Sequence, residues 1–148
     1  MKPFYNKWKA FLMTEKDDDS ENIAKVVITL QNGKVLLLKR SKSVEKFADN
    51  WDLPGGHLKI GEEMETGLNR EVQEETGLNI SEIYKKELYS EGEITYFLIK
   101  TEKDEDNIDI KLSDEHIDYV FSSIEELENY NISNIFLTAI KRAKGFAD

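Results

Sequence analysis

The hydrophobic positions of the chain change their period several times, and each change marks an expected element. Two aliphatic runs, residues 23–30 and 34–40, flank an Asn-Gly dipeptide, which strongly favours a tight β-hairpin turn. Residues 62–76 repeat their apolar side chains at helical spacing, and Gly77 follows where a left-handed helix cap belongs. The pattern therefore predicts a hairpin, then the irregular segment WDLPGG, then an amphipathic helix.

The second half of the chain alternates shorter elements. Strands are expected in residues 78–90, 93–101, 108–112 and 118–123. Ser123 can cap a short helix over IEELENY, and SNIFLTAIKRAKG is expected to form the closing helix. That helix has four residues available for packing: Ile135, Leu137, Ile140 and Ala143. Because strands and helices are mixed, we expect an α/β (α+β) fold with a mixed sheet covered by helices.

The length fits a single domain, residues 1–148, in which residues 1–22 form an N-terminal extension. Within the extension, a short amphipathic helix is expected over FYNKWKAFLM, with an apolar face of Phe4, Trp8, Phe11 and Leu12. Its role stays open between a packing helix, a dimer contact and a lid. Two acidic stretches, residues 15–22 and 102–109, are interpreted as solvated loops.

The formal net charge is −10, and the chain has no cysteine. This charge argues against a nucleic-acid polymer as partner, because phosphates would be repelled. The lack of cysteine excludes thiolate metal sites and suits a reducing cytosol, so a cytoplasmic location is expected. No stretch approaches the roughly 20 apolar residues that span a bilayer, so no membrane partner is expected. An anionic substrate would need local positive charge, for which a divalent cation is the expected source.

The helix expected over residues 62–76 aims carboxylates toward its own apolar side. On a wheel of about 100° per residue, the apolar stripe consists of Met64, Leu68 and Val72. Glu71 and Glu75 fall inside or beside this stripe, and Glu74 lies on its border. Buried carboxylates are costly unless they are protonated, paired or metal-bound. Hard oxygen ligands of this kind select Mg²⁺, Mn²⁺ or Ca²⁺.

The alternative is an exposed acidic helix in which Arg70 and Glu74 form an ion pair one turn apart. The residues before the helix favour the metal site instead. Gly55 and Gly56 follow a proline, and adjacent glycines there mark a tight bend where backbone carbonyls can approach a ligand. Gly77 then ends the helix directly after the acids.

Residues 56–78 resemble the signature of the Nudix hydrolases: glycine, five residues, glutamate, seven residues, then Arg-Glu-aliphatic-x-Glu-Glu-x-Gly-aliphatic. Every specified position is filled here, by Gly56, Glu62, Arg70, Glu71, Val72, Glu74, Glu75, Gly77 and Leu78. The resemblance implies a Nudix-type α/β/α sandwich with a mixed β-sheet and a loop–helix–loop catalytic motif. It also implies hydrolysis of a nucleoside diphosphate linked to another group X, with Mg²⁺, or alternatively Mn²⁺, as cofactor.

The resemblance also assigns roles to the residues of this Nudix box. The metal ions would be held by Glu71, Glu74 and Glu75, one of which would also activate water. Arg70 would orient Glu71, and the Gly55 carbonyl would be a further metal ligand. The catalytic set is therefore Arg70, Glu71 and Glu74. The structural positions are Gly56, Glu62 and Gly77, with Glu62 bracing the loop–helix–loop.

The downstream segment resembles that of the diadenosine tetraphosphate hydrolases, a Nudix branch. The matching residues are Tyr96, Glu115, His116 and Tyr119. Two positions depart from the branch, because Gly55 stands where lysine is usual and Val120 replaces a common tryptophan. A dinucleoside polyphosphate is therefore one candidate for the substrate.

Each candidate outside the box has two interpretations. Glu115 is either an extra metal ligand from a distant loop or a surface glutamate. His57 and Arg40 could meet substrate phosphates, or be a solvent-facing loop histidine and a surface arginine. Tyr96 and Tyr119 could stack on a base, although Tyr96, on a strand, could equally belong to the core.

Three functions remain open from the sequence. The leading one is a Mg²⁺-dependent pyrophosphohydrolase that acts on a small nucleotide diphosphate. The second is a nucleotide-binding regulatory module that has lost chemistry; such proteins usually lose a box glutamate, and none is lost here. The third is a cation-binding structural helix, which metal would stabilise and nucleotides would not stabilise further. A homodimer is compatible with each, since Nudix proteins are often dimers.

Overall fold

The computed structural model describes residues 22–41 and 49–145, and the helix expected near the N-terminus lies outside them. The described strands are β1 (Ile23–Thr29), β2 (Val35–Arg40), β3 (Trp51–Asp52), β4 (Gly55–His57), β5 (Lys86–Glu91), β6 (Ile94–Lys100) and β7 (His116–Ser122). The helices are α2 (Met64–Thr76) and α3 (Asn134–Ala143), with two 3₁₀ turns, η1 (Glu105–Asn107) and η2 (Leu127–Asn129). No helix within these ranges is long and apolar enough to cross a membrane.

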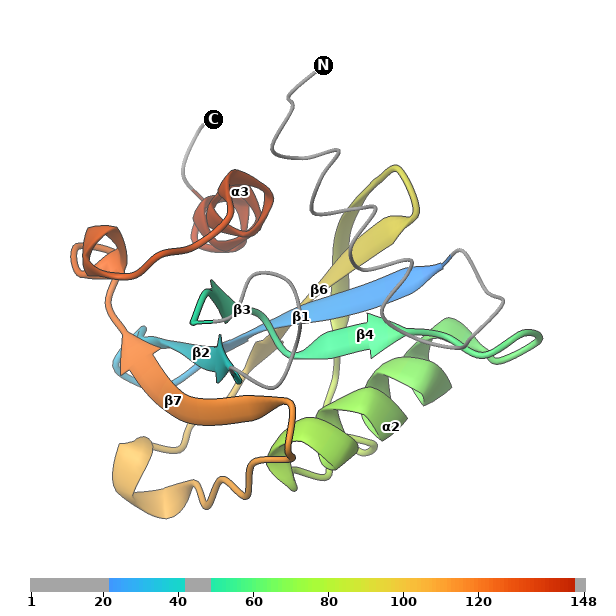
Figure 1. The fold of residues 1–148 in the computed structure, drawn as a ribbon, viewed down its shortest axis with the longest axis horizontal. Coiled ribbons are helices and arrows are strands. Elements are labelled where there is room, and N and C mark those ends of the chain that lie inside the picture. Colours follow the sequence, from blue (N-terminus) through green and yellow to red (C-terminus); the bar gives the residue numbers. More distant parts are fainter. Residues whose placement is uncertain (1–21, 42–48, 146–148) are drawn as a thin grey trace.

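The strands form one mixed sheet in the order β3-β2-β1-β6-β5, with β4 paired to β1 and β7 paired to β2. β1 runs parallel to β6 along its whole length, and the expected hairpin turn joins β1 to β2 through Gly33 at φ 86°. The two hairpin strands share only the pair Thr29–Val35 and then separate. Because β4 pairs with the start of β1 and β3 with the end of β2, WDLPGG lies where these strands part (Figure 1).

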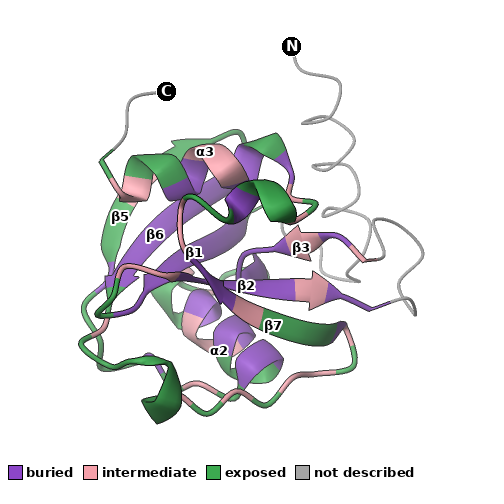
Figure 2. Ribbon diagram, turned by 90° about the vertical axis from the view of Figure 1, so that its left-hand side faces the viewer, coloured by how far each residue is buried: buried purple, intermediate pink, exposed green. Residues whose placement is uncertain are grey.

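Each face of the sheet packs on one helix, because alternate residues of a strand point to opposite faces. One cluster joins α2 to β1 through Leu68, Val72, Ala24, Val26 and Ile28. The other joins α3 to β1 through Phe136, Ala139, Ile140, Ile23 and Val27. The two helices lie on opposite sides of the sheet, and the central strands are buried between them (Figures 1 and 2). This confirms the mixed sheet and the α/β/α layers.

The helix expected over residues 62–76 and the closing helix are both present, as α2 and α3. α2 ends at Thr76, and Gly77 follows at φ 77° with its N–H donating to the Gln73 carbonyl. α3 begins after Ser133, whose hydroxyl oxygen accepts from the Ile135 N–H. The sequence therefore encoded these boundaries locally, through one glycine and one serine.

Three other expectations are wrong in whole or part. Residues 108–112 form no strand. Their apolar side chains alternate with polar ones along the sequence and pack against the α2 side of the core without strand pairing. The alternation therefore reflects burial alone. Residues 124–130 form only the η2 turn instead of a helix, although Ser123 does bond to Glu126 as a cap would. The strand expected in residues 78–90 begins only at Lys86.

Candidate active site

The acidic side of α2 lies against β4. Glu71 and Glu75 are 1% and 6% exposed, even though each carries a carboxylate. The Glu74 side chain, by contrast, is 56% exposed. The helical wheel is thus confirmed for the two inward glutamates and for Glu74 on the border of the buried side.

The backbone of β4 is closely packed between the Glu71 side chain of α2 and the backbone of β1, and the requirement for glycine is strict at Gly55. The Gly55 N–H donates to Glu75 Oε1 at 2.8 Å. A Cβ atom at Gly56 would lie 2.5 Å from Glu71 Oε1, and one at Gly55 would lie 2.1 Å from the Ala24 carbonyl oxygen. Gly55 also has φ 119°, a conformation that favours glycine. The double glycine therefore places one backbone donor on Glu75 and leaves room for the Glu71 carboxylate, and the approach of a carbonyl to a ligand stays a prediction.

Arg70 ties the loop before α2 to the acids of the helix. Its guanidinium donates to both oxygens of Glu62, at 2.9 and 3.0 Å, and to the His57 carbonyl at 3.2 Å. It also donates to Glu71 at 3.2 Å and to Glu74 at 3.1 Å. The hydrogen bond between Arg70 and Glu62 raises the pKa of the arginine and lowers that of the glutamate. The expected Arg70–Glu71 contact is present, and Glu62 anchors Arg70 through two bonds.

Glu75 is held in an environment that disfavours its charge. Burial raises the pKa of Glu75 to about 7, because the carboxylate loses its contact with water. The positive charges of Lys25 and His116 oppose this shift, and the negative charge of Glu71 adds to it. A further cation beside Glu75 would therefore stabilise its charged form.

Lys25 belongs to this site, although the sequence pattern did not single it out. Its ammonium donates to the Leu53 carbonyl at 3.0 Å and to the Gly55 carbonyl at 2.9 Å. The side chain is 2% exposed, and its Nζ lies 5.5 Å from the ring centroid of Phe136. A single charged residue inside the aliphatic run IAKVVIT was the available signal.

Asp52 forms a second buried cluster of charges beside Lys25. It accepts a hydrogen bond from Arg40 Nη1 at 3.3 Å, and its Oδ1 lies 3.1 Å from His116 Nε2. Burial alone would raise the pKa of Asp52, but His116, Lys25 and Arg40 lower it to about 2. Burial likewise acts to lower the pKa of His116, and the charge of Asp52 outweighs it, so that this pKa is raised. Asp52 was not among the candidates from the sequence. Its partner His116 lies 64 positions further along the chain, so no local pattern connects the two.

Several substrate-contact candidates are buried. Arg40 is 5% exposed and engaged with Asp52, which corrects its interpretation as an ordinary surface arginine. His57 is 2% exposed on β4, so the solvent-facing loop interpretation is wrong. Tyr96 is 1% exposed and packs against Tyr89 with ring centroids 5.0 Å apart. This burial favours the core interpretation of Tyr96 over base stacking, because both sides of its ring are covered.

Two candidates near β7 remain accessible. Tyr119 is 38% exposed and packs edge-on against Phe121. Glu115 is partly exposed in the segment just before β7. That segment is tied to α2, because the Ser113 N–H donates to the Glu75 carbonyl at 3.3 Å. The backbone two residues before Glu115 therefore lies against the end of α2, and the role of Glu115 as a metal ligand stays a prediction.

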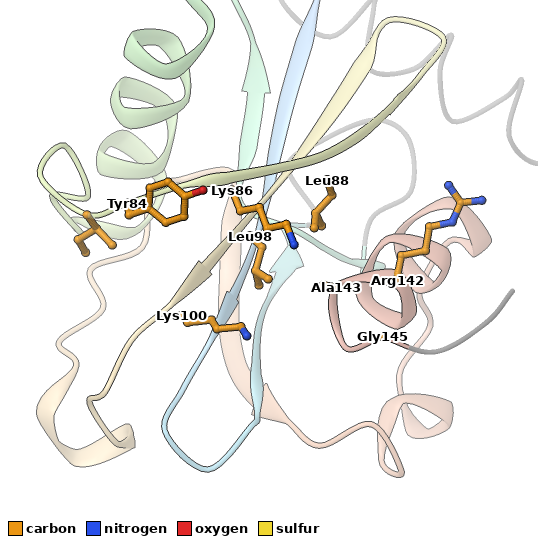
Figure 3. Close-up of a pocket in the computed structure, with 9 residues that line it drawn as sticks. Tyr84, Lys86, Leu88, Leu98, Lys100, Arg142, Ala143 and Gly145 are labelled. Atoms are coloured by element: carbon orange, nitrogen blue, oxygen red, sulfur yellow. The ribbon is translucent and has the colours of Figure 1, made fainter.

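A cavity of about 400 Å³ lies elsewhere, between β5, β6 and the end of α3. Its lining includes Leu88, Leu98, Lys86, Lys100 and Arg142 (Figure 3). The end of α3 forms part of this cavity, whereas the glutamates belong to α2, on the opposite side of the sheet (Figure 1). The cavity is therefore separate from the acidic site.

Residues 21–140 match the family model described as the NUDIX domain. The chain belongs to the Nudix family. A Nudix relative, the nucleoside triphosphatase NudI of Escherichia coli O81 (strain ED1a), is 31% identical over 130 residues, 78% of this chain and 92% of that protein. The m7GpppN-mRNA hydrolase NUDT17 of Xenopus laevis is 51% identical over 59 residues, 39% of this chain. That match spans 20% of the length of NUDT17.

The Nudix fold also recurs in solved structures. The MutT protein of Methanosarcina mazei Go1 has a TM-score of 0.67 at 26% identity, covering 88% of this chain and 96% of that one. An Ap4A hydrolase of C. elegans has a TM-score of 0.67 at 21% identity, covering 84% and 96%. Both confirm the predicted fold, and the likeness to the Ap4A hydrolase extends to the fold alone.

The Nudix box supplies the oxygen ligands that a divalent cation prefers. Where β4 passes α2, Glu75 accepts from the Gly55 N–H and Glu71 lies against Gly56, while Glu74 is more exposed on the same helix. Within the described residues, no three acidic or histidine side chains already converge on one point. The Arg70 guanidinium donates hydrogen bonds to Glu71 and Glu74, while Glu75 accepts one from the Gly55 N–H. The donor set therefore fits Mg²⁺ or Mn²⁺ in its chemistry, and Arg70 competes for two of the carboxylates.

Proposed function

We propose that this Nudix protein hydrolyses a P–O–P bond in a small nucleotide, a nucleoside diphosphate linked to another group, with Mg²⁺ or Mn²⁺ as cofactor. The observation that carries the proposal is the burial of two carboxylates, Glu71 and Glu75, directly under the Gly55–Gly56 backbone. The pKa of Glu75, raised by burial to about 7, indicates that its charge lacks sufficient compensation within the protein. A purely structural helix would gain stability from apolar residues at such positions.

Each box residue has a role in this proposal. The ligands of the cation are Glu71, Glu74, Glu75 and the Gly55 carbonyl, with Glu115 as a further ligand. The bound cation supplies neutralisation of phosphate charge and a more acidic coordinated water. Arg70 positions Glu71 and Glu74 and is itself fixed by both oxygens of Glu62. Positioning and charge neutralisation are what phosphoryl transfer chiefly requires.

The substrate class follows from the relatives and from the charge of the chain. NudI is named a nucleoside triphosphatase, and that name describes a substrate in which a chain of phosphates is attached to a nucleoside. The net charge of −10 disfavours a long polyanion as substrate and favours a small nucleotide. Tyr119 is the accessible candidate for stacking on a base, and His57, next to the box glycine, is the candidate for a phosphate.

The test is a hydrolysis panel with Mg²⁺, with products separated by chromatography. The panel contains dinucleoside polyphosphates, ADP-ribose, nucleotide sugars, NADH and nucleoside triphosphates. Glu74→Gln is the matched control, because it removes one charged ligand from an exposed side chain and leaves the core intact. We expect the wild-type protein to cleave one class and the variant to lose that activity. Tight nucleotide binding without cleavage of any class would favour the regulatory module instead.

A further inference from the structure

Lys25 places a positive charge on the Gly55 carbonyl, one of the proposed metal ligands. Its Nζ donates at 2.9 Å to the carbonyl of Gly55, the carbonyl proposed to bind the cation. The N–H of the same glycine donates to Glu75 Oε1 at 2.8 Å. Gly55 therefore connects the ammonium directly to a buried carboxylate. Lys25 lies outside the Nudix box, on β1.

The surroundings of the Lys25 ammonium resemble those of a bound cation. Two carbonyls, those of Leu53 and Gly55, lie on either side of Pro54 and both accept from Nζ. Burial disfavours the charged forms of Glu75 and Asp52, and the charge of Lys25 acts in the opposite direction on both. Because the side chain is only 2% exposed, water screens this charge poorly, and its field acts on any ion that binds at Gly55.

We propose that the buried ammonium group of Lys25 acts as a fixed positive charge beside the metal site. In the metal-free protein its ammonium compensates the buried carboxylates and fixes the Leu53–Gly55 bend. When a divalent ion binds at the Gly55 carbonyl, the same charge repels it and so sets a lower affinity. This inference rests on the proposed function, because it takes Gly55, Glu71 and Glu75 as ligands of the ion. It assigns Lys25 the role of a positioning residue that tunes metal affinity.

The test measures binding of Mn²⁺ alone, without nucleotide, from the loss of the free Mn²⁺ signal in electron paramagnetic resonance. Lys25→Met keeps the length and apolar body of the side chain and removes its charge. We expect it to bind Mn²⁺ at least about tenfold more tightly than the wild-type protein, since a like charge at short range in a buried site is removed. Lys100→Met is the matched control, because it removes one exposed lysine at the C-terminal end of β6 and should leave Mn²⁺ binding unchanged.

Thermal unfolding gives a second measurement that separates the outcomes. Metal-free Lys25→Met should unfold at a lower temperature than the wild-type protein. Added Mn²⁺ should raise the unfolding temperature of the variant by more than that of the wild-type protein. Should Lys25→Met not fold, Lys25→Gln takes its place, because it retains an amide donor for the carbonyls and still lacks the charge. Equal or weaker Mn²⁺ binding by a folded variant overturns the role of Lys25 alone. Absence of Mn²⁺ binding by every protein overturns the metal site and this role together.

Discussion

Among single residues, Glu75 has a buried carboxylate whose charged form lowers the stability of the metal-free protein. Its carboxylate is buried beneath Gly55, with partial compensation from the charges of Lys25 and His116. An apolar side chain at this position would extend the α2 side of the core without that cost. Functional sites commonly retain groups that destabilise the free protein, and Glu75 fits that pattern.

The burial of Glu75 predicts a pH dependence of stability in the metal-free protein. Its pKa is 4.5 in the unfolded reference and about 7 in the folded state. Between these values the folded protein binds more protons than the unfolded chain, so the free energy of unfolding falls as pH rises from 4.5 toward 7. The shift corresponds to about 3 kcal/mol. Glu75→Gln should therefore be more stable than the wild-type protein at pH 8 while losing its turnover.

Urea unfolding at pH 5 and pH 8, in the presence of EDTA, measures this effect. Glu74→Gln serves as the control, because its exposed side chain should change the pH dependence little. His116 contributes a fall of the same sign, since its pKa is also raised, so the difference between wild type and Glu75→Gln isolates Glu75. Identical pH dependence in the two proteins would contradict a costly buried carboxylate at this position.

Among the elements, β4, the following loop and α2 form one unit that is held by Arg70. The loop contributes Glu62, β4 contributes the His57 carbonyl, and α2 contributes Glu71 and Glu74. The planar guanidinium satisfies all four at once through a fixed fork of donors. Helix and loop therefore keep one relative position, which sets where the carboxylates lie.

Arg70→Lys tests this unit, because an ammonium cannot reproduce the fork. We expect kcat to fall by about ten- to a hundredfold, as small displacements of catalytic groups do. Thermal stability should fall only modestly, by about 1–2 kcal/mol, for the lost hydrogen bonds. The control is Arg142→Lys, an exposed arginine of α3 on the other side of the sheet. Full kcat in Arg70→Lys would argue against the positioning role.

In the whole molecule, the site lies where the β1–β2 hairpin opens and the sheet divides. β3 and β4 enter there and bring Asp52 and Gly55 beside Lys25 of β1. The two helices bury separate clusters on the two faces of the sheet, so the charged groups sit between well-packed layers. A rigid frame of this kind suits a site that must hold several like charges close together.

This arrangement predicts that divalent cations stabilise the whole fold. At a Mg²⁺ concentration of 100 times its Kd, the free energy of unfolding should rise by about 2.7 kcal/mol. A Tm series with Mg²⁺, and with NaCl at matched ionic strength, measures the specific part. Glu71→Gln should lose that part, since it removes a buried charged ligand. An equal response to NaCl and Mg²⁺ would indicate general screening of the net charge instead.

The sequence by itself determined the acidic helix α2 and the family. Helical periodicity placed Glu71 and Glu75 on the buried side of α2, and Gly77 fixed where the helix ends. These features depend on residues a few positions apart, whose relative directions the α-helix dictates. The Nudix box was readable for the same reason, because its residues share one loop and one helix.

Only the tertiary structure decided which charges surround the box. Lys25 meets the Gly55 carbonyl across 30 positions, and His116 meets Asp52 across 64. Such contacts depend on strand order and on the separation of β1 from β2, which no local pattern encodes. The same holds for Tyr96, because a strand residue points to the core or to the site according to the layers that cover its sheet. Local geometry thus fixed which glutamates of α2 point inward, and long-range packing fixed which charges surround them.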